Sequence, residues 1–251
     1  MAKYKKMNEI ERNHEIFVTA HRGANAECPE NTILAFQTAV DVGADLIEMD
    51  IHKTTDDDIV VIHDSTTKRV GNVALSVDDS SLADLQQVEL GKDQRIPTLD
   101  EVFAEFKGKI GFVIEIKAKD LTDLLLEKIT KHDVADSCII ISFKHEELSK
   151  FKQKNSEIPV AALDPTGGGW LTTWLLKSRI VESAVDNGFD GLHPLHNLMN
   201  KKFIDRAHKK NLFVNAWTAD TKKSWKRLIN ADIDGITTND PRGLIEYLNE
   251  K

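Results

Sequence analysis

Short apolar runs rich in β-branched residues recur along the chain, and most are followed by a segment with the apolar spacing of a helix. This alternation is typical of βαβ units that build a parallel sheet. If 45–52 and 59–63 are counted as one unit, there are eight runs, the number that closes a barrel of parallel strands. The runs are 16–20, 45–52 with 59–63, 111–116, 138–142, 160–163, 191–193, 212–217 and 235–238. The pattern predicts an α/β fold of the TIM-type (β/α)8 barrel class.

A first helix is predicted directly after the first strand. A polar pair can cap its start, apolar residues recur on one of its faces, and a glycine provides a stop. These residues are Asn31 and Thr32, then Ile33, Phe36 and Val40, then Gly43.

The alternation fails between about 64 and 97, where polar residues, glycines and several aspartates replace it. We interpret this stretch as an inserted subdomain after the second strand, placed over one mouth of the barrel. A helix is predicted to restart at 98–106, and Gly167–Trp170 marks a long loop after the fifth strand. We find no interdomain linker, so residues 1–251 are predicted to form one domain.

Composition and charge narrow the class of protein. The chain has 251 residues, 41% of them hydrophobic and 29% charged, which suits one soluble domain. The formal charge of −8 argues against binding of duplex nucleic acid, although small anionic substrates remain compatible with it. Cys28 and Cys138 are too few for a disulfide framework. The charged N-terminal stretch lacks a signal-peptide pattern and no apolar run is long enough to span a membrane, so we expect a cytoplasmic protein.

Three acidic residues on two predicted strands suggest a metal site. Glu48 and Asp50 are two residues apart on an apolar strand, so both side chains point to the same face. Glu115 lies at the end of the following strand. A single strand-end acid is more often paired with a lysine or arginine. Two carboxylates on one face with a third beside them favour a hard divalent cation with oxygen ligands.

Two histidines follow predicted strands, at the rim where barrel enzymes carry their active sites. His21 follows the first strand and His63 follows the run 59–62. Two histidines can transfer protons near neutral pH. One histidine would take a proton from the attacking oxygen, and the other would give a proton to the leaving group. Because a lone histidine is more often structural, this hypothesis depends on the positions of His21 and His63 at strand ends. We interpret four other histidines as structural, namely His14, His132, His145 and His208.

Positive and polar side chains accompany these groups. Arg22 and Lys117 place positive charge beside the acids, which suits a bound phosphate, with a salt-bridge network as the alternative. Asn31 is assigned equally to capping the first helix and to facing the rim.

The motifs in order resemble the glycerophosphodiester phosphodiesterases. They are HRG with PENT, EMDIHKTTDDDIVVIHD, EIK, NAWTADT and GITTNDP, and the likeness runs from about 18 to 241. The resemblance implies a TIM-type barrel with a small insertion, one divalent cation (Mg or Ca), and hydrolysis of glycerophosphodiesters to sn-glycerol 3-phosphate and an alcohol.

The resemblance also implies individual roles. His21 and His63 become the acid and base, the metal ligands are Glu48, Asp50 and Glu115, and the phosphate contacts are Arg22 and Lys117. Trp217 takes the place of an aromatic beside the glycerol moiety, with ordinary barrel packing as the alternative. The chain departs from the family pattern at 56–58, where a glycine-containing turn is usual, and at 68–70, where a hydroxyl-rich stretch is usual.

Two other functions stay open. A related barrel phospholipase would act on intact lipid phosphodiesters and need a membrane-facing surface, for which the apolar cluster Trp170–Leu176 is a candidate. A catalytically silent barrel would bind glycerol phosphate, but all five proposed histidines and acids are present. Residue types do not choose between direct attack by water and a cyclic phosphate intermediate, nor do they identify the alcohol or the oligomeric state.

Overall fold

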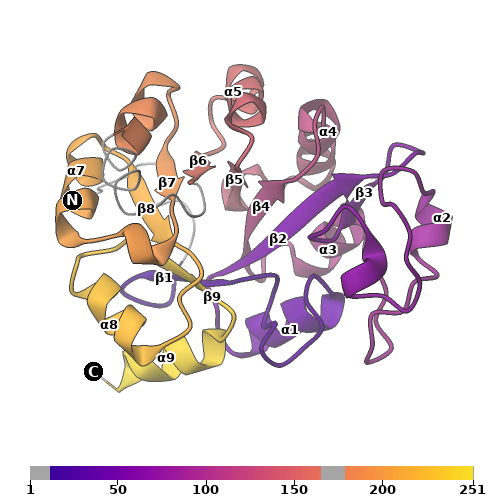
Figure 1. Cartoon of the computed structure of the whole chain (residues 1–251), viewed down its shortest axis with the longest axis horizontal. Helices are drawn as coiled ribbons and strands as arrows, with labels where there is room; N and C mark the ends of the chain where they lie inside the picture. Colours follow the sequence, from indigo (N-terminus) through magenta and orange to yellow (C-terminus); the bar gives the residue numbers. More distant parts are fainter. Residues whose placement is uncertain (1–11, 165–178, 251) are drawn as a thin grey trace.

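The computed structural model describes residues 12–164 and 179–250. Within them, eight parallel strands form a barrel that closes because β1 pairs with β2 on one side and with β9 on the other (Figure 1). The strands are β1 (Phe17–Ala20), β2 (Leu46–Lys53), β4 (Gly111–Ile116), β5 (Cys138–Ser142), β6 (Val160–Leu163), β7 (Gly191–His193), β8 (Phe213–Ala216) and β9 (Gly235–Thr238). Each coincides with one of the eight predicted runs, with β2 ending one residue later than predicted, at Lys53, so the predicted TIM-type barrel is confirmed.

Helices alternate with the strands and surround the barrel (Figure 1). They are α1 (Ile33–Asp41), α3 (Leu99–Phe106), α4 (Thr122–His132), α5 (His145–Lys154), α7 (Lys201–Lys209), α8 (Lys222–Ile229) and α9 (Pro241–Asn249), with further helical residues at 179–186. Three short 3-10 turns also occur among the described residues, namely η2 (Thr67–Arg69), η3 (Ala135–Ser137) and η4 (His196–Leu198).

Alternation along β2 separates two hydrophobic layers. Ile47, Met49 and Ile51 point outward into the large core between strands and helices. Leu46 points inward, into a smaller core that fills the barrel together with residues such as Phe213. Because side chains alternate across a strand, Glu48 and Asp50 share the inward face with Leu46.

A hairpin extends β2 into the antiparallel strand β3 (Ile59–Val61). Asp57 in its turn has a φ of 60°, in the left-handed region that glycine favours and that aspartate tolerates better than most residues. The aspartates at 56–58 therefore build the turn without the glycine that is usual there.

Residues 64–97 run from β3 to α3 and contain η2 and α2 (Leu82–Leu85). A separate cluster of buried apolar side chains joins this segment to β3, and it includes Val60, Val77, Leu85 and Ile96. The segment thus has a small core of its own beside the barrel.

Two expectations concern residues outside those described. The Gly167–Trp170 loop and the Trp170–Leu176 cluster fall within 165–178. Among the residues that are described, no helix has both the length and the apolar character needed to cross a membrane. The cytoplasmic location stays a prediction.

Candidate active site

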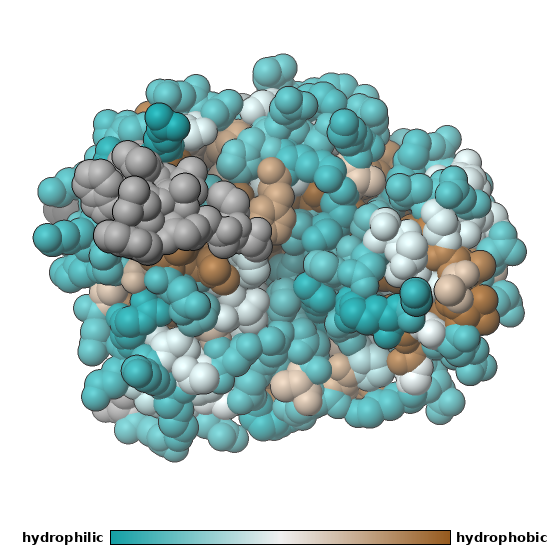
Figure 2. All heavy atoms as spheres, in the orientation of Figure 1, coloured by the Kyte–Doolittle hydropathy of each residue, from teal (hydrophilic) through white to brown (hydrophobic). Residues whose placement is uncertain are grey.

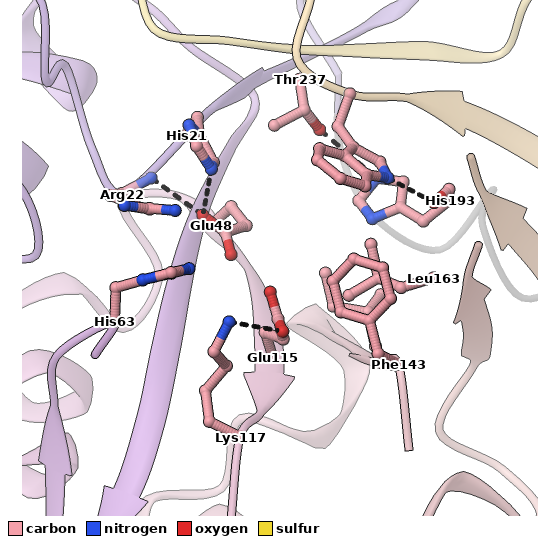
Figure 3. A pocket seen from close by; sticks show the side chains of 12 residues that line it. His21, Arg22, Glu48, His63, Glu115, Lys117, Phe143, Leu163, His193 and Thr237 are labelled. Carbon is pink, nitrogen blue, oxygen red and sulfur yellow. Dashed lines mark hydrogen bonds and ion pairs between the residues drawn. The ribbon is translucent and has the colours of Figure 1, made fainter. Parts of the chain in front are cut away.

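A pocket opens inside the barrel at the carboxyl ends of its strands (Figure 3). Figure 2 shows a recessed, mostly hydrophilic area near the middle of the face in view. Charged side chains gather on one side of the pocket and apolar ones on the other. The lining residues are His21, Arg22, Glu48, His63, Glu115, Lys117, Ile141, Phe143, Leu163, His193, Trp217 and Thr237.

The three predicted acids meet at this pocket. Asp50 on β2 is the direct register partner of Glu115 on β4, and Glu48 lies two residues earlier on the same face of β2. One carboxylate oxygen from each lies within 4.8 Å of the others, and all three residues are buried. Sheet register therefore brings together carboxylates that are far apart in the sequence.

Burial shifts the proton equilibria of these acids. It raises the pKa of Glu48 well above its usual value, and the charges of Asp50 and Glu115 raise that pKa further. Burial and the charge of Asp50 likewise raise the pKa of Glu115 to about 7. For Asp50, burial opposes ionisation, but Lys117 and Arg22 outweigh it and hold its pKa below the usual value.

The acids fit a divalent cation. Three buried carboxylates supply the hard oxygen ligands that Mg²⁺ and Ca²⁺ prefer. Within the described residues, Asp50 Oδ1 has no hydrogen-bond partner, although the Lys117 ammonium lies 3.5 Å away. A bound cation would satisfy that oxygen and offset the mutual repulsion of the acids.

Two cations flank the acids, as predicted. Lys117 follows β4, and its Nζ lies 2.9 Å from Glu115 Oε1. Arg22 follows His21, and its Nε lies 3.3 Å from Asp50 Oδ2. Both side chains also line the pocket. The same arrangement is therefore compatible with a salt-bridge network and with a contact to a bound anion.

His21 stands directly after β1. Its Nδ1 lies 2.6 Å from Asn239 Oδ1, and its Nε2 lies 4.0 Å from Glu48 Oε2. Burial lowers the pKa of His21 below its usual value, and the positive charge of Arg22 lowers it further. The ring is therefore mainly neutral near pH 7, as a proton acceptor must be.

His63 follows β3 and is held by an ion-pair chain. Its Nδ1 lies 2.6 Å from Asp64 Oδ1, and Asp64 Oδ2 accepts from Arg69 Nε at 2.6 Å. Arg69 donates two hydrogen bonds to Glu30, at 2.7 and 2.8 Å, and Glu30 also accepts from Arg22 Nη1 at 2.9 Å. The segment after β3 is thereby tied to Arg22, which lines the pocket.

Asn31 and Thr32 have separate tasks. The hydroxyl of Thr32 accepts from Ala35 N and caps α1, whereas the buried Asn31 donates from Nδ2 to Asp50 Oδ2 at 2.9 Å. Of the two predicted roles of Asn31, the one toward the site has a matching contact and helix capping belongs to Thr32.

Phe143 and Leu163 form an apolar wall across the pocket from Glu48 (Figure 3), and Trp217 lines the pocket in contact with Phe143. Its indole Nε1 donates to the carbonyl of His193 at 2.7 Å, and its ring meets Phe143 edge-on with centroids 5.6 Å apart. Leu163 at the end of β6 completes the wall. Trp217 therefore both packs and lines the pocket.

Some lining residues were missed by the sequence reasoning. Phe143, Leu163, Ile141 and Thr237 have no distinguishing residue chemistry, although each lies at or beside a strand's carboxyl end. His193 is another missed residue; it is buried on β7, and burial lowers its pKa to about 3. Its position at the end of a predicted strand was the available signal.

The four histidines interpreted as structural do not line the pocket. His14, His132 and His208 each face an aspartate, namely Asp45, Asp100 and Asp234. His145 contacts the carbonyl of Leu163. These contacts agree with structural roles.

Comparison with known proteins shows which protein family the chain matches. Residues 21–242 match the model of the "Glycerophosphoryl diester phosphodiesterase family". A glycerophosphodiester phosphodiesterase of Caldanaerobacter subterraneus subsp. tengcongensis is 32% identical over 245 residues, covering 92% of this chain and 97% of that protein. A Bacillus subtilis protein of the same name is 28% identical, covering 90% and 84% respectively.

Solved structures share the fold. An Oleispira antarctica phosphodiesterase, solved in complex with the product sn-glycerol-3-phosphate, has a TM-score of 0.83 at 20% identity, covering 97% of this chain and 99% of that one. A Thermotoga maritima glycerophosphodiester phosphodiesterase has a TM-score of 0.78 at 24% identity, covering 94% and 99%.

Proposed function

The chain belongs to the glycerophosphoryl diester phosphodiesterase family, and from that premise we propose that it hydrolyses glycerophosphodiesters to sn-glycerol 3-phosphate and an alcohol, using one divalent cation and two histidines. The observation that carries the proposal is the meeting of three buried carboxylates, two histidines and two cationic side chains in one pocket. The product bound to the Oleispira antarctica neighbour supports the choice of substrate.

Glu48, Asp50 and Glu115 would hold the cation, Mg²⁺ or Ca²⁺. When bound, it would supply positive charge for a nonbridging phosphate oxygen. Arg22 and Lys117 would orient the phosphate by charge-assisted hydrogen bonds.

His21 and His63 would transfer the protons. Both rings point toward Glu48 in Figure 3. One ring would remove the proton of the attacking oxygen, and the other would protonate the oxygen of the departing alcohol. Each Nδ1 is already occupied by a neighbour, Asn239 or Asp64, so Nε2 is the nitrogen available for transfer on each ring.

The apolar wall would contact the carbon side of the glycerol moiety. Trp217 offers a flat, half-buried face beside Phe143 and Leu163. Because the wall lies across the pocket from Glu48, it would orient the substrate while the charged side holds the phosphate.

Release of sn-glycerol 3-phosphate from glycerophosphocholine and glycerophosphoethanolamine tests this function. Chelator-treated protein should be inactive and should recover with Mg²⁺ or Ca²⁺. Glu48→Gln keeps the side-chain volume but removes a ligand charge, so it should abolish the recovery. Glu246→Gln, at an exposed position on α9, is the matched control and should behave like the unmodified chain.

Absence of release with every cation would contradict the proposal. The same assay with a lysophospholipid or intact phospholipid would then test the lipid-substrate alternative, and binding of glycerol phosphate without turnover would indicate the silent barrel.

A further inference from the structure

His21 is connected by hydrogen bonds to Asn239 in the motif GITTNDP and through it to Asp220 in the motif NAWTADT, and neither residue takes part in the proposed reaction. Its Nδ1 lies 2.6 Å from Asn239 Oδ1. The other end of the same amide, Asn239 Nδ2, donates to Asp220 Oδ2 at 2.7 Å. Asp220 stands in the loop after β8 and Asn239 directly after β9, so the two last barrel strands converge on the histidine of the first.

The direction of these hydrogen bonds follows from the carboxylate. Asp220 Oδ1 accepts from Thr238 Oγ1 at 2.9 Å and from the backbone N of Asn239 at 2.8 Å. An ionised carboxylate only accepts, so the amide NH₂ of Asn239 must face Asp220 and its oxygen must face His21. Asn25 agrees with this orientation, because its Nδ2 donates to the same Asn239 oxygen at 2.7 Å.

The orientation of the amide decides the tautomer of the imidazole. Asn239 Oδ1 can only accept, so His21 Nδ1 must carry the hydrogen between them. In the neutral ring Nε2 is then bare, and it is the nitrogen that lies 4.0 Å from Glu48 Oε2 in the pocket.

We propose that Asn239 and Asp220 are positioning residues that hold His21 in its Nδ1–H tautomer, so that Nε2 accepts the proton of the attacking oxygen. When Nε2 gains that proton, the ring becomes an imidazolium and the Nδ1–H bond to Asn239 is kept. His63 gives a proton to the departing alcohol, and after the products leave, His21 loses its proton to water while His63 regains one. This role rests on the proposed function of the site, but the tautomer itself can be measured without any reaction.

Asp220→Asn tests the orientation. The new NH₂ would face the NH₂ of Asn239, so the amide must turn or separate, and the acceptor for His21 Nδ1 is lost. We expect kcat to fall at least about tenfold through the wrong tautomer. KM should change less than about twofold, because Arg22 and Lys117 are untouched. Asp205→Asn, at a partly exposed site on α7, removes the same charge and should leave kcat unchanged.

The reversed pair is the rescue. In Asn239→Asp with Asp220→Asn, the carboxylate at 239 again accepts from His21 and Asn25, and the amide at 220 donates to it while still accepting from Thr238. The hydrogen bonds from His21, Asn25 and Thr238 keep their directions and only the one between 220 and 239 is reversed, so the double variant should regain the Nδ1–H tautomer that Asp220→Asn loses. A purely structural role of the carboxylate at 220 would predict no such recovery.

Ring ¹⁵N chemical shifts read the tautomer at pH 8, above the ordinary pKa of an imidazole, with His21→Gln identifying the signal. We expect the Nδ1–H tautomer in the unmodified chain, its loss in Asp220→Asn and its return in the reversed pair. We expect kcat to fall and recover in the same variants. An Nε2–H tautomer in the unmodified chain would overturn the proposal even if no variant folded. Retention of Nδ1–H in Asp220→Asn, or no recovery in the reversed pair, would also overturn it. If the tautomers follow this order but no phosphodiester is cleaved, the proposed function fails and the positioning stands.

Discussion

His21 and His63 reach the same pocket from different strands, and each is held at Nδ1 by a residue outside the three proposed metal ligands. The partner of His63 is a sequence neighbour, Asp64, whereas that of His21 is Asn239, 218 positions away. Both arrangements leave Nε2 for proton transfer.

Replacing either histidine should therefore remove a proton-transfer step. We expect His21→Ala and His63→Ala each to lower kcat by about two orders of magnitude or more, measured by steady-state release of sn-glycerol 3-phosphate. His132→Ala is the control, since that ring faces Asp100 away from the pocket, and its kcat should stay within about twofold. Unchanged turnover in His21→Ala or His63→Ala would remove that histidine from the mechanism.

The turn from β1 to α1 depends on close packing of its backbone. Gly23 has a φ of 80°, and a Cβ there would lie 2.7 Å from the backbone carbon of Ala35 in α1. The turn also carries His21 and Arg22, so a shift of the backbone would move two site residues.

Two glycine substitutions separate backbone conformation from packing. Gly43 has a φ of 84° but open space at the Cβ position. Gly43→Ala should therefore lower the free energy of unfolding by about 1–2 kcal/mol, the cost of a left-handed alanine, with kcat unchanged. Gly23→Ala should lower it more, and kcat should also fall about tenfold or more because misplaced groups react slowly. Denaturant unfolding and kinetics check both, and equal effects of the two variants would refute the packing argument.

The acids at the barrel mouth couple the stability of the whole chain to pH and to the cation. The folded-state pKa of Glu115 is about 7, above its ordinary value of 4.5. Between these two pH values the folded chain holds a proton that the unfolded chain has released, so the free energy of unfolding falls as pH rises through this window. A cation selects the ionised acids and should restore the stability lost.

The cation should thus stabilise the fold more at pH 8 than at pH 6. With cation at about 100 times its Kd at pH 8, we expect about 2.7 kcal/mol of stabilisation and a rise in Tm of about 5–10 °C. Thermal unfolding with and without cation at the two pH values measures the difference. Glu115→Gln should reduce it and Glu246→Gln should not; an equal rise in Tm at both pH values would contradict the assignment of Glu115 as a ligand.

Local pattern was enough to predict the strands and part of the site. Period-two alternation places Glu48 and Asp50 on one face regardless of what lies around them, and a strand's end can be read from where its apolar run stops. That is why the sequence predicts the positions of His21, His63, Glu115 and Lys117 at the barrel mouth, where all four line the pocket.

Tertiary structure alone decided which groups meet. Helix-capping chemistry suits Asn31 and Thr32 equally, and only packing directs Asn31 toward Asp50. The amide that orients His21 and the aromatic partner of Trp217 lie on strands or loops distant in sequence. Periodicity describes the neighbours of a residue along its own segment, whereas barrel closure and register determine its neighbours across the sheet. Those long-range contacts assign the tautomer, the shifted pKa values and the shape of the pocket.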